Sequence, residues 1–343
     1  MKEDVMTLVR PNILDLEPYS TARDDYKGGV GIFLDANENP FENGFNRYPD
    51  PHQARLKAMI SKIRGIPVEQ MFIGNGSDEA IDLCYRIFCV PGRDNAVIIA
   101  PSYGMYGVAA AINDVEVRKV QLEDDYSLPT VRLLAACDRN TKLIMVCSPN
   151  NPTGNAFPIS EIASLAAAAP CVLVVDEAYV DFSDKGSATE LLDRFDNLIV
   201  LQTLSKAYGM AGLRLGLAFM QGKVARLFAN VKYPYNIDTA AMQQAFSMLG
   251  RDIASEVEEI VAERNRVGAL LPMCRCVEKV WPSDANFLLV KVTDPKGLYD
   301  ALIGRQVIVR DRSRVKGCEG CLRITVGTRA ENDIMLETIQ KFR

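Results

Sequence analysis

The stretch "CVLVVDEAY" at residues 171–179 decides the class of fold. Its apolar run is continuous rather than alternating, which is typical of a strand that is buried on both faces of a sheet. The run ends at Asp176, and a carboxylate at the end of a buried strand needs a cationic partner. Asp176 could instead cap the following turn or bind a metal ion.

Similar runs recur along the chain and alternate with helical patterns. The alternation predicts an α/β fold, with a mainly parallel sheet that helices cover on both faces. Helices are expected at residues 78–88 and 159–169. The other strand-like runs lie at residues 71–76, 95–101, 142–149, 197–205 and 213–220.

Small or polar residues follow each of these runs. In parallel sheets, ligands bind at the carboxyl ends of the strands. We therefore expect one crevice to be lined by residues from several strand ends, namely Gly76, Ser77, Asp78, Ser102, Tyr103, Asn150, Asn151, Asp176, Tyr179, Ser205 and Lys206.

The length of 343 residues is sufficient for two domains. Residues 1–30 are mixed and polar, and they predict an N-terminal arm with little regular structure. Residues 31–230 contain the alternating strands and helices of a large domain. Residues 231–343 predict a smaller α+β domain, and we expect the arm to pack near it. This smaller domain begins with a long helical pattern, continues with strand-like runs at 286–292, 306–312 and 321–327, and closes with a helix from residue 331.

The overall composition is that of a globular protein, with 48% hydrophobic and 24% charged residues. A formal net charge of -5 argues against a nucleic-acid partner. The N-terminal sequence lacks a signal peptide, and no apolar run reaches the roughly 18 residues that span a bilayer. We therefore expect neither a membrane nor a nucleic acid among the partners.

Nine cysteines lie mostly in apolar runs, and their odd number predicts reduced thiols in a cytoplasmic protein. The pairs "CRC" at 274–276 and "CEGC" at 318–321 could form two halves of a zinc site. The first pair is too closely spaced for this, and the single histidine, His52, adds few ligands. We expect no metal, and a histidine-based triad is also disfavoured.

The stretch "TLSKAYGMAGLRLG" at 203–216 places Lys206 among apolar residues, with Arg214 close behind it. A lysine in a dry, partly cationic pocket has a lowered pKa and becomes nucleophilic toward carbonyls. The stretch "GNGSDEAIDL" at 74–83 opens a helix whose backbone N–H groups could hold a phosphate, although an ordinary glycine turn with a good cap explains it equally well. A phosphate cofactor that carries an aldehyde would use the lysine, the anion site, Asp176 and Arg214.

On these residues the chain resembles the pyridoxal-phosphate-dependent aminotransferases of fold type I. The motifs "LDANENPF", "RYPDP", "SPNNPTGN" and "CLRITVGT" extend the resemblance over nearly the whole chain. "SPNNPTG" is shared by many aminotransferases, whereas "RYPDP", "CLRITVGT" and the N-terminal "LEPYSTAR" indicate the branch that acts on histidinol phosphate. The resemblance implies a seven-stranded sheet in the large domain, pyridoxal 5'-phosphate as cofactor and a homodimer with a shared active site. It also implies transfer of an amino group from L-histidinol phosphate to 2-oxoglutarate in histidine biosynthesis, which gives imidazole acetol phosphate and L-glutamate.

The resemblance further assigns roles to single residues. Lys206 would form a Schiff base with the cofactor and move the substrate proton, and Asp176 would pair with the pyridine nitrogen. Asn151 and Tyr179 would bind the phenolic oxygen, and Tyr103 would stack on the ring. The cofactor phosphate would be held by Gly76, Ser77, Asp78, Thr203, Ser205 and Arg214, and by Tyr48 of a second copy of the chain. The substrate would be bound by Tyr19, Asn37, Arg310 and Arg323.

Other activities on the same scaffold remain open from the sequence. An aromatic amino acid aminotransferase and a threonine-phosphate decarboxylase would carry much the same cofactor residues. A cofactor-binding regulator or non-catalytic homologue would be expected to lack Lys206 or Asp176, and both are present.

Overall fold

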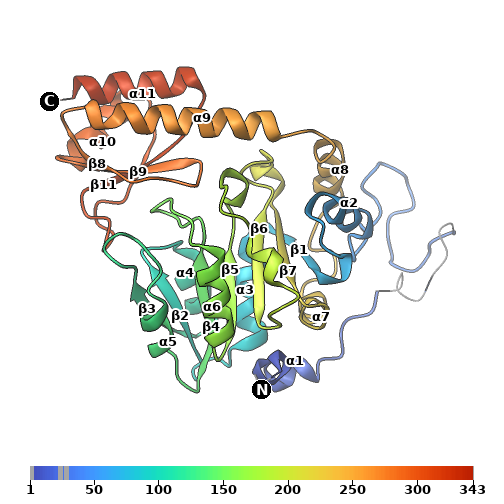
Figure 1. Ribbon diagram of the computed structural model, residues 1–343. Coiled ribbons are helices and arrows are strands. Elements are labelled where there is room, and N and C mark those ends of the chain that lie inside the picture. Colours follow the sequence, from blue (N-terminus) through green and yellow to red (C-terminus); the bar gives the residue numbers. More distant parts are fainter. Residues whose placement is uncertain (1–3, 22–25, 27–30, 343) are drawn as a thin grey trace.

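The structure is a computed structural model in which residues 4–21, 26 and 31–342 are described (Figure 1). Within these residues the strands form a seven-stranded sheet and a four-stranded sheet. The order in the large sheet is β1-β7-β6-β5-β4-β2-β3, and only β7 runs antiparallel to its neighbours. Its strands are β1 Met71–Asn75, β2 Asn95–Ala100, β3 Glu116–Gln121, β4 Thr141–Cys147, β5 Val172–Asp176, β6 Leu198–Thr203 and β7 Leu215–Met220.

Helices cover both faces of this sheet, which explains the continuous apolar strands. In β5, Leu173 and Val175 pack into the core shared with α5 Thr130–Ala135 and α6 Ile159–Ala168. Val172 and Val174 point to the opposite core, which is shared with α3 Gly76–Phe88, α4 Met105–Ile112 and α7 Gly222–Val231. Because successive side chains of a strand alternate between faces, both sets must be apolar. The predicted fold class is confirmed.

The small sheet is antiparallel, with the order β10-β11-β9-β8. Its strands are β8 Val277–Val280, β9 Phe287–Val292, β10 Arg310–Asp311 and β11 Cys321–Thr325. Three helices share its core, namely α9 Ala254–Leu270, α10 Pro295–Gly304 and α11 Arg329–Lys341. The predicted strand at 306–312 is shorter than expected, because only its last residues, from Arg310 onward, pair with β11.

The long helical pattern after residue 231 is divided into two helices. α8 Thr239–Met248 ends before "LGRDI", and α9 begins at Ala254. α8 packs beside α2 Ala54–Arg64, and its Ala241 and Ala245 belong to the core of the large domain. The division of the chain at residue 230 remains a proposal. None of the described helices is both long enough and apolar enough to cross a membrane.

The first described residues correct the expected position of the N-terminal arm. They form a short 3-10 helix, η1 Val5–Leu8, and α1 Pro11–Leu14, so the arm is not without regular structure. Val5, Val9 and Ile13 are buried in the core around α3 and α7, because this apolar row needs a partner surface. Figure 1 shows α1 at the end of the molecule away from the small domain. Residues 1–3, 22–25 and 27–30 of the predicted arm lie outside the described residues.

Candidate active site

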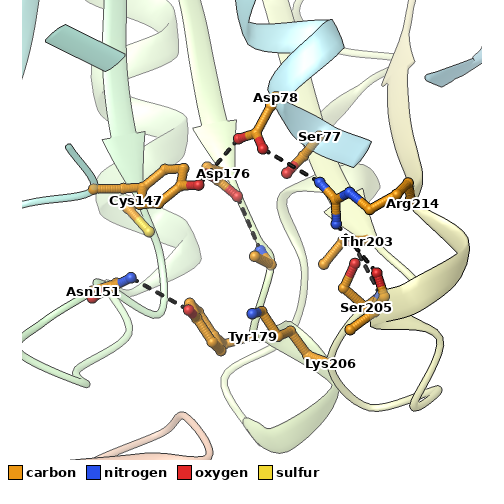
Figure 2. A pocket seen from close by; sticks show the side chains of 13 residues that line it. Ser77, Asp78, Cys147, Asn151, Asp176, Tyr179, Thr203, Ser205, Lys206 and Arg214 are labelled. Carbon is orange, nitrogen blue, oxygen red and sulfur yellow. Dashed lines mark hydrogen bonds and ion pairs between the residues drawn. The ribbon is translucent and has the colours of Figure 1, made fainter. Parts of the chain in front are cut away.

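A cavity of about 120 Å³ lies where the carboxyl ends of β4, β5 and β6 meet the N-terminus of α3. In Figure 2, Lys206 and Asp176 both reach into it. The cavity is lined by Ser77, Asp78, Tyr103, Cys147, Asn151, Asp176, Ala178, Tyr179, Thr203, Ser205, Lys206, Ala211 and Arg214. All predicted cofactor-binding residues except Gly76 and Tyr48 are therefore among its lining residues.

Lys206 stands at the mouth of this cavity. Its neighbours Leu204 and Ala207 are buried, but Lys206 itself is exposed, so its surroundings are wetter than the dry pocket that we expected. Its Nζ atom lies 5.7 Å from the centre of the Tyr179 ring. Loss of hydration, followed by the charges of Arg323 and Arg214, lowers the pKa of Lys206. A lysine with a lowered pKa is more readily deprotonated and so becomes a nucleophile.

Asp176 is only 3% exposed, and burial raises its pKa to about 6. Its carboxylate accepts a hydrogen bond of 2.7 Å from the Tyr106 hydroxyl and one of 3.1 Å from the Ala178 N–H group. Both bonds oppose the effect of burial. Among the described residues it has no ion-pair partner, so the expected cation is not supplied by a side chain. A buried carboxylate that lines a cavity and has no ion-pair partner among the described residues fits a positively charged ring nitrogen.

Tyr106 was not singled out from the sequence. It lies in α4 and is fully buried, and the Tyr85 hydroxyl donates to its carbonyl oxygen at 2.9 Å. Tyr103, which lines the cavity, packs edge-on against it at 5.6 Å. Tyr103 lies just before α4, so the two tyrosines do not share a helical face, and no signal in the sequence pointed to Tyr106.

The N-terminus of α3 forms the opposite side of the cavity from Asn151. Backbone N–H groups in the first turn of a helix have no acceptor within the helix and can bind an anion. Arg214 approaches this turn, and its Nη2 atom lies 3.4 Å from the Asp78 carboxylate, which also accepts from the Tyr103 hydroxyl at 3.1 Å. A Cβ atom on Gly76 would overlap the Arg214 guanidinium, so glycine is required there for the close approach.

Three residues link the cavity to the small domain. The Arg323 Nη1 atom donates to the Asn151 Oδ1 atom at 2.6 Å. The Asn151 amide in turn donates to the Tyr179 hydroxyl at 3.3 Å. Burial raises the pKa of Tyr179, so its hydroxyl keeps its proton at neutral pH. The arrangement places amide and phenol donors beside a guanidinium at one end of the cavity.

The remaining predicted residues lie outside this cavity. Tyr48 stacks on Tyr235 with ring centres 4.4 Å apart, and it lines a second cavity together with Asn37. Tyr19 is 73% exposed. Arg310 is on the small sheet, directly opposite Arg323. One chain therefore brings together Lys206 and the cofactor residues predicted within the same chain, but not Tyr19, Asn37 or Tyr48.

Comparison with known proteins identifies the family of the chain. The family model for Aminotransferase class I and II matches residues 35–339. The chain belongs to this family. It is 47% identical to the histidinol-phosphate aminotransferase of Bacteroides thetaiotaomicron, over 98% of each chain. The resemblance noted from the sequence is thus confirmed.

Solved structures of similar proteins agree with the fold. The histidinol-phosphate aminotransferase from Clostridium acetobutylicum has a TM-score of 0.79 at 22% identity, over 87% of this chain and 90% of that chain. The histidinol-phosphate aminotransferase from Sinorhizobium meliloti, in complex with pyridoxal-5'-phosphate, has a TM-score of 0.76 at 25% identity, over 86% and 82% of the two chains.

Proposed function

We propose that this aminotransferase uses pyridoxal 5'-phosphate to transfer the amino group of L-histidinol phosphate to 2-oxoglutarate, in histidine biosynthesis. The observation that carries the proposal is the convergence of Lys206, Asp176 and the N-terminus of α3 on one cavity. The amine of Lys206 matches the aldehyde of that cofactor, and the buried carboxylate of Asp176, which has no ion-pair partner among the described residues, matches the pyridine nitrogen. The anion site at α3 matches the phosphate. The substrate is suggested by the name of the 47% identical relative.

The cofactor, when bound, supplies an electron-accepting ring that stabilises the carbanion formed at the substrate Cα atom. Asp176 holds a proton on the ring nitrogen, because an ionised carboxylate favours a neighbouring cation. Asn151 and Tyr179 donate hydrogen bonds to the phenolic oxygen, and Tyr103 packs on the ring. Lys206 would remove the proton from Cα and return it to the carbon on the other side of the substrate nitrogen, since its lowered pKa suits a general base.

The phosphate of the cofactor is held at the start of α3. Ser77 and Asp78 offer backbone N–H groups there, and Arg214 offers a guanidinium. The Asp78 side chain is already engaged by Tyr103 and Arg214. Gly76, Thr203 and Ser205 complete this end of the cavity.

Arg323 and Arg310 bind the anionic end of each substrate. One arginine fork can hold a phosphate ester or a carboxylate, so the same pair serves both half-reactions. Tyr19 and Asn37 are further substrate contacts in this proposal.

We also propose a homodimer in which Tyr48 reaches the cofactor phosphate of the partner. Residues 31–48 carry several exposed apolar side chains, and surfaces of this kind are usually covered by a protein partner. These side chains are Ile32, Leu34, Phe41, Phe45 and Tyr48. None of the nine cysteines, all of which the structure describes, forms a disulfide bond, which supports a cytoplasmic location.

A substrate panel tests the proposal. We expect glutamate formation from 2-oxoglutarate to be fastest with L-histidinol phosphate, slower with phenylalanine, and absent with threonine phosphate, from which no carbon dioxide is released. A higher kcat/KM for phenylalanine would favour an aromatic aminotransferase instead. Release of carbon dioxide from threonine phosphate would favour a decarboxylase.

A further inference from the structure

The pairing of β10 with β11 places arginines on one face of the small sheet. Arg310 lies directly opposite Arg323. The Arg312 N–H group donates to the Cys321 carbonyl oxygen at 2.9 Å, so the antiparallel pairing continues beyond β10. Residues that face each other across such a pair lie on the same side, as do residues two apart on one strand. Arg310, Arg312 and Arg323 therefore share one face.

This face is directed toward the large domain. Leu322 and Ile324, which alternate with Arg323 on β11, pack into the small-domain core formed with α9, α10 and α11. Cys321 belongs instead to the core of the large domain, as does Leu289, which lies opposite Arg323 on β9. The bond from Arg323 to Asn151 joins the same face to the proposed cofactor site.

The turn after Arg312 is held against the large domain. The Tyr126 hydroxyl donates to the Gly317 carbonyl oxygen at 2.7 Å. A Cβ atom on Gly317 would lie 3.1 Å from the Pro101 ring, so this turn fits closely at the end of β2. Val315 packs against the large-domain core. These contacts fix the backbone from which the Arg312 side chain extends.

The positive charges on this face have no paired carboxylate within the part of the chain that the structure describes. The Nε atoms of Arg312 and Arg323 are buried without a hydrogen-bond partner. Among the described residues, none of the three arginines forms an ion pair with a carboxylate. Asp311 alternates to the other side and accepts from the Ser313 N–H group at 2.7 Å. Burial, and then the charges of Arg323 and Arg310, lower the pKa of Arg312.

Like charges directly opposite each other across a strand pair are unfavourable, and a buried donor without an acceptor costs free energy. Both costs are relieved when an anion binds between the guanidinium groups. A phosphate monoester suits this position better than a carboxylate does, because it carries a charge of about -1.5 to -2 at pH 7 and has three acceptor oxygens.

We infer that Arg312 is a specificity-determining residue, which forms with Arg310 and Arg323 a three-arginine site for the phosphate end of the amino substrate. The inference rests on the proposed function and extends it, since Arg312 favours the phosphate-bearing substrate over glutamate. Arg310 and Arg323 suffice for a singly charged carboxylate, whereas the third guanidinium matches the additional charge and oxygen of the phosphate.

The test compares Arg312→Gln with a matched control, Arg314→Gln, which removes an exposed arginine two residues further along the chain. Each holoenzyme is mixed rapidly with L-histidinol phosphate alone or L-glutamate alone, and the concentration that gives half of the maximal rate is measured. We expect Arg312→Gln to raise this concentration by roughly ten- to a hundredfold for histidinol phosphate, the loss expected for a charged hydrogen bond, and by less than about threefold for glutamate. Arg314→Gln should change neither value.

Inorganic phosphate provides a measurement that does not depend on catalysis. Calorimetric titration of the holoenzyme should show phosphate binding that Arg312→Gln weakens at least about tenfold and that Arg312→Lys partly restores. Phosphate binding that is equal in wild type and Arg312→Gln, or equal losses for both substrates, would overturn the role of Arg312. If the wild-type holoenzyme reacts with glutamate but not with histidinol phosphate, the proposed function fails, and the phosphate titration still decides whether Arg312 is part of an anion site.

Discussion

Replacement of Asp176 by asparagine is expected to stabilise the cofactor-free protein while it abolishes function. Asp176 is 3% exposed, and burial raises its pKa from 3.8 to about 6. The folded state therefore keeps a proton that the unfolded state releases, and the associated stability is lost as the pH rises from about 3.8 through 6. Above this range, the free energy of unfolding is lower by about 3 kcal/mol.

An asparagine cannot ionise, so it avoids this loss. It also keeps both contacts of the site, because its carbonyl oxygen can accept from Ala178 and the Tyr106 hydroxyl can accept from its amide. We expect the gain in the free energy of unfolding to be about 3 kcal/mol at pH 8 and about 1 kcal/mol at pH 4.5. This gain in stability is possible because the Asp176 carboxylate is needed to bind the cofactor and is not needed to stabilise the fold.

Urea unfolding of the cofactor-free protein at both pH values measures this difference. Asp184→Asn is the control, since it removes a carboxylate whose side chain is 88% exposed. The reasoning would be refuted by an Asp176→Asn variant that is no more stable than wild type at pH 8. An equal gain at both pH values would also refute it, because the gain would then not arise from ionisation.

Three further substitutions test other parts of the site. Tyr106→Phe removes the donor at 2.7 Å from Asp176, and we expect it to weaken cofactor binding roughly ten- to a hundredfold in a fluorescence titration. Unchanged affinity would show that the phenol does not support the carboxylate. Gly216→Ala places a methyl group into the backbone of Ser77, so we expect a lower Tm and weaker cofactor binding. A variant that is as stable as wild type would contradict this close packing. Arg323→Lys loses the fork that holds either anion, and kcat/KM should fall for both substrates; retained activity on either one would remove Arg323 from that role.

The sequence predicted the buried part of the large sheet well, because continuous apolar runs are distinctive. β3 was not predicted, because its sequence "EVRKVQ" is charged. The strand lies at the edge of the sheet, where one side is exposed to solvent. β8 was missed for a similar reason, because "VEKV" is short and lies at the edge of the small sheet. Apolar periodicity identifies strands by their burial, and edge strands are only partly buried.

The sequence also predicted those residues of the candidate site that lie at the ends of the buried strands. Asp176, Asn151 and Lys206 could be grouped from the sequence because parallel strands end at one edge of the sheet. Tyr106 and Arg312 could not, since their positions depend on helix packing and on the register of two antiparallel strands. The burial of the arm could in part be predicted from the sequence, because Val5, Val9 and Ile13 recur at helical spacing and so indicate a buried face.

The absorbance spectrum of the purified protein with added pyridoxal 5'-phosphate tests the central claim most directly. Wild type should turn yellow, lose the colour when L-histidinol phosphate is added without a keto acid, and regain it with 2-oxoglutarate. Lys206→Ala should bind the cofactor but fail to complete this cycle. A wild-type protein that stays colourless with the cofactor, or a Lys206→Ala variant that completes the cycle as fast as wild type, would contradict the account.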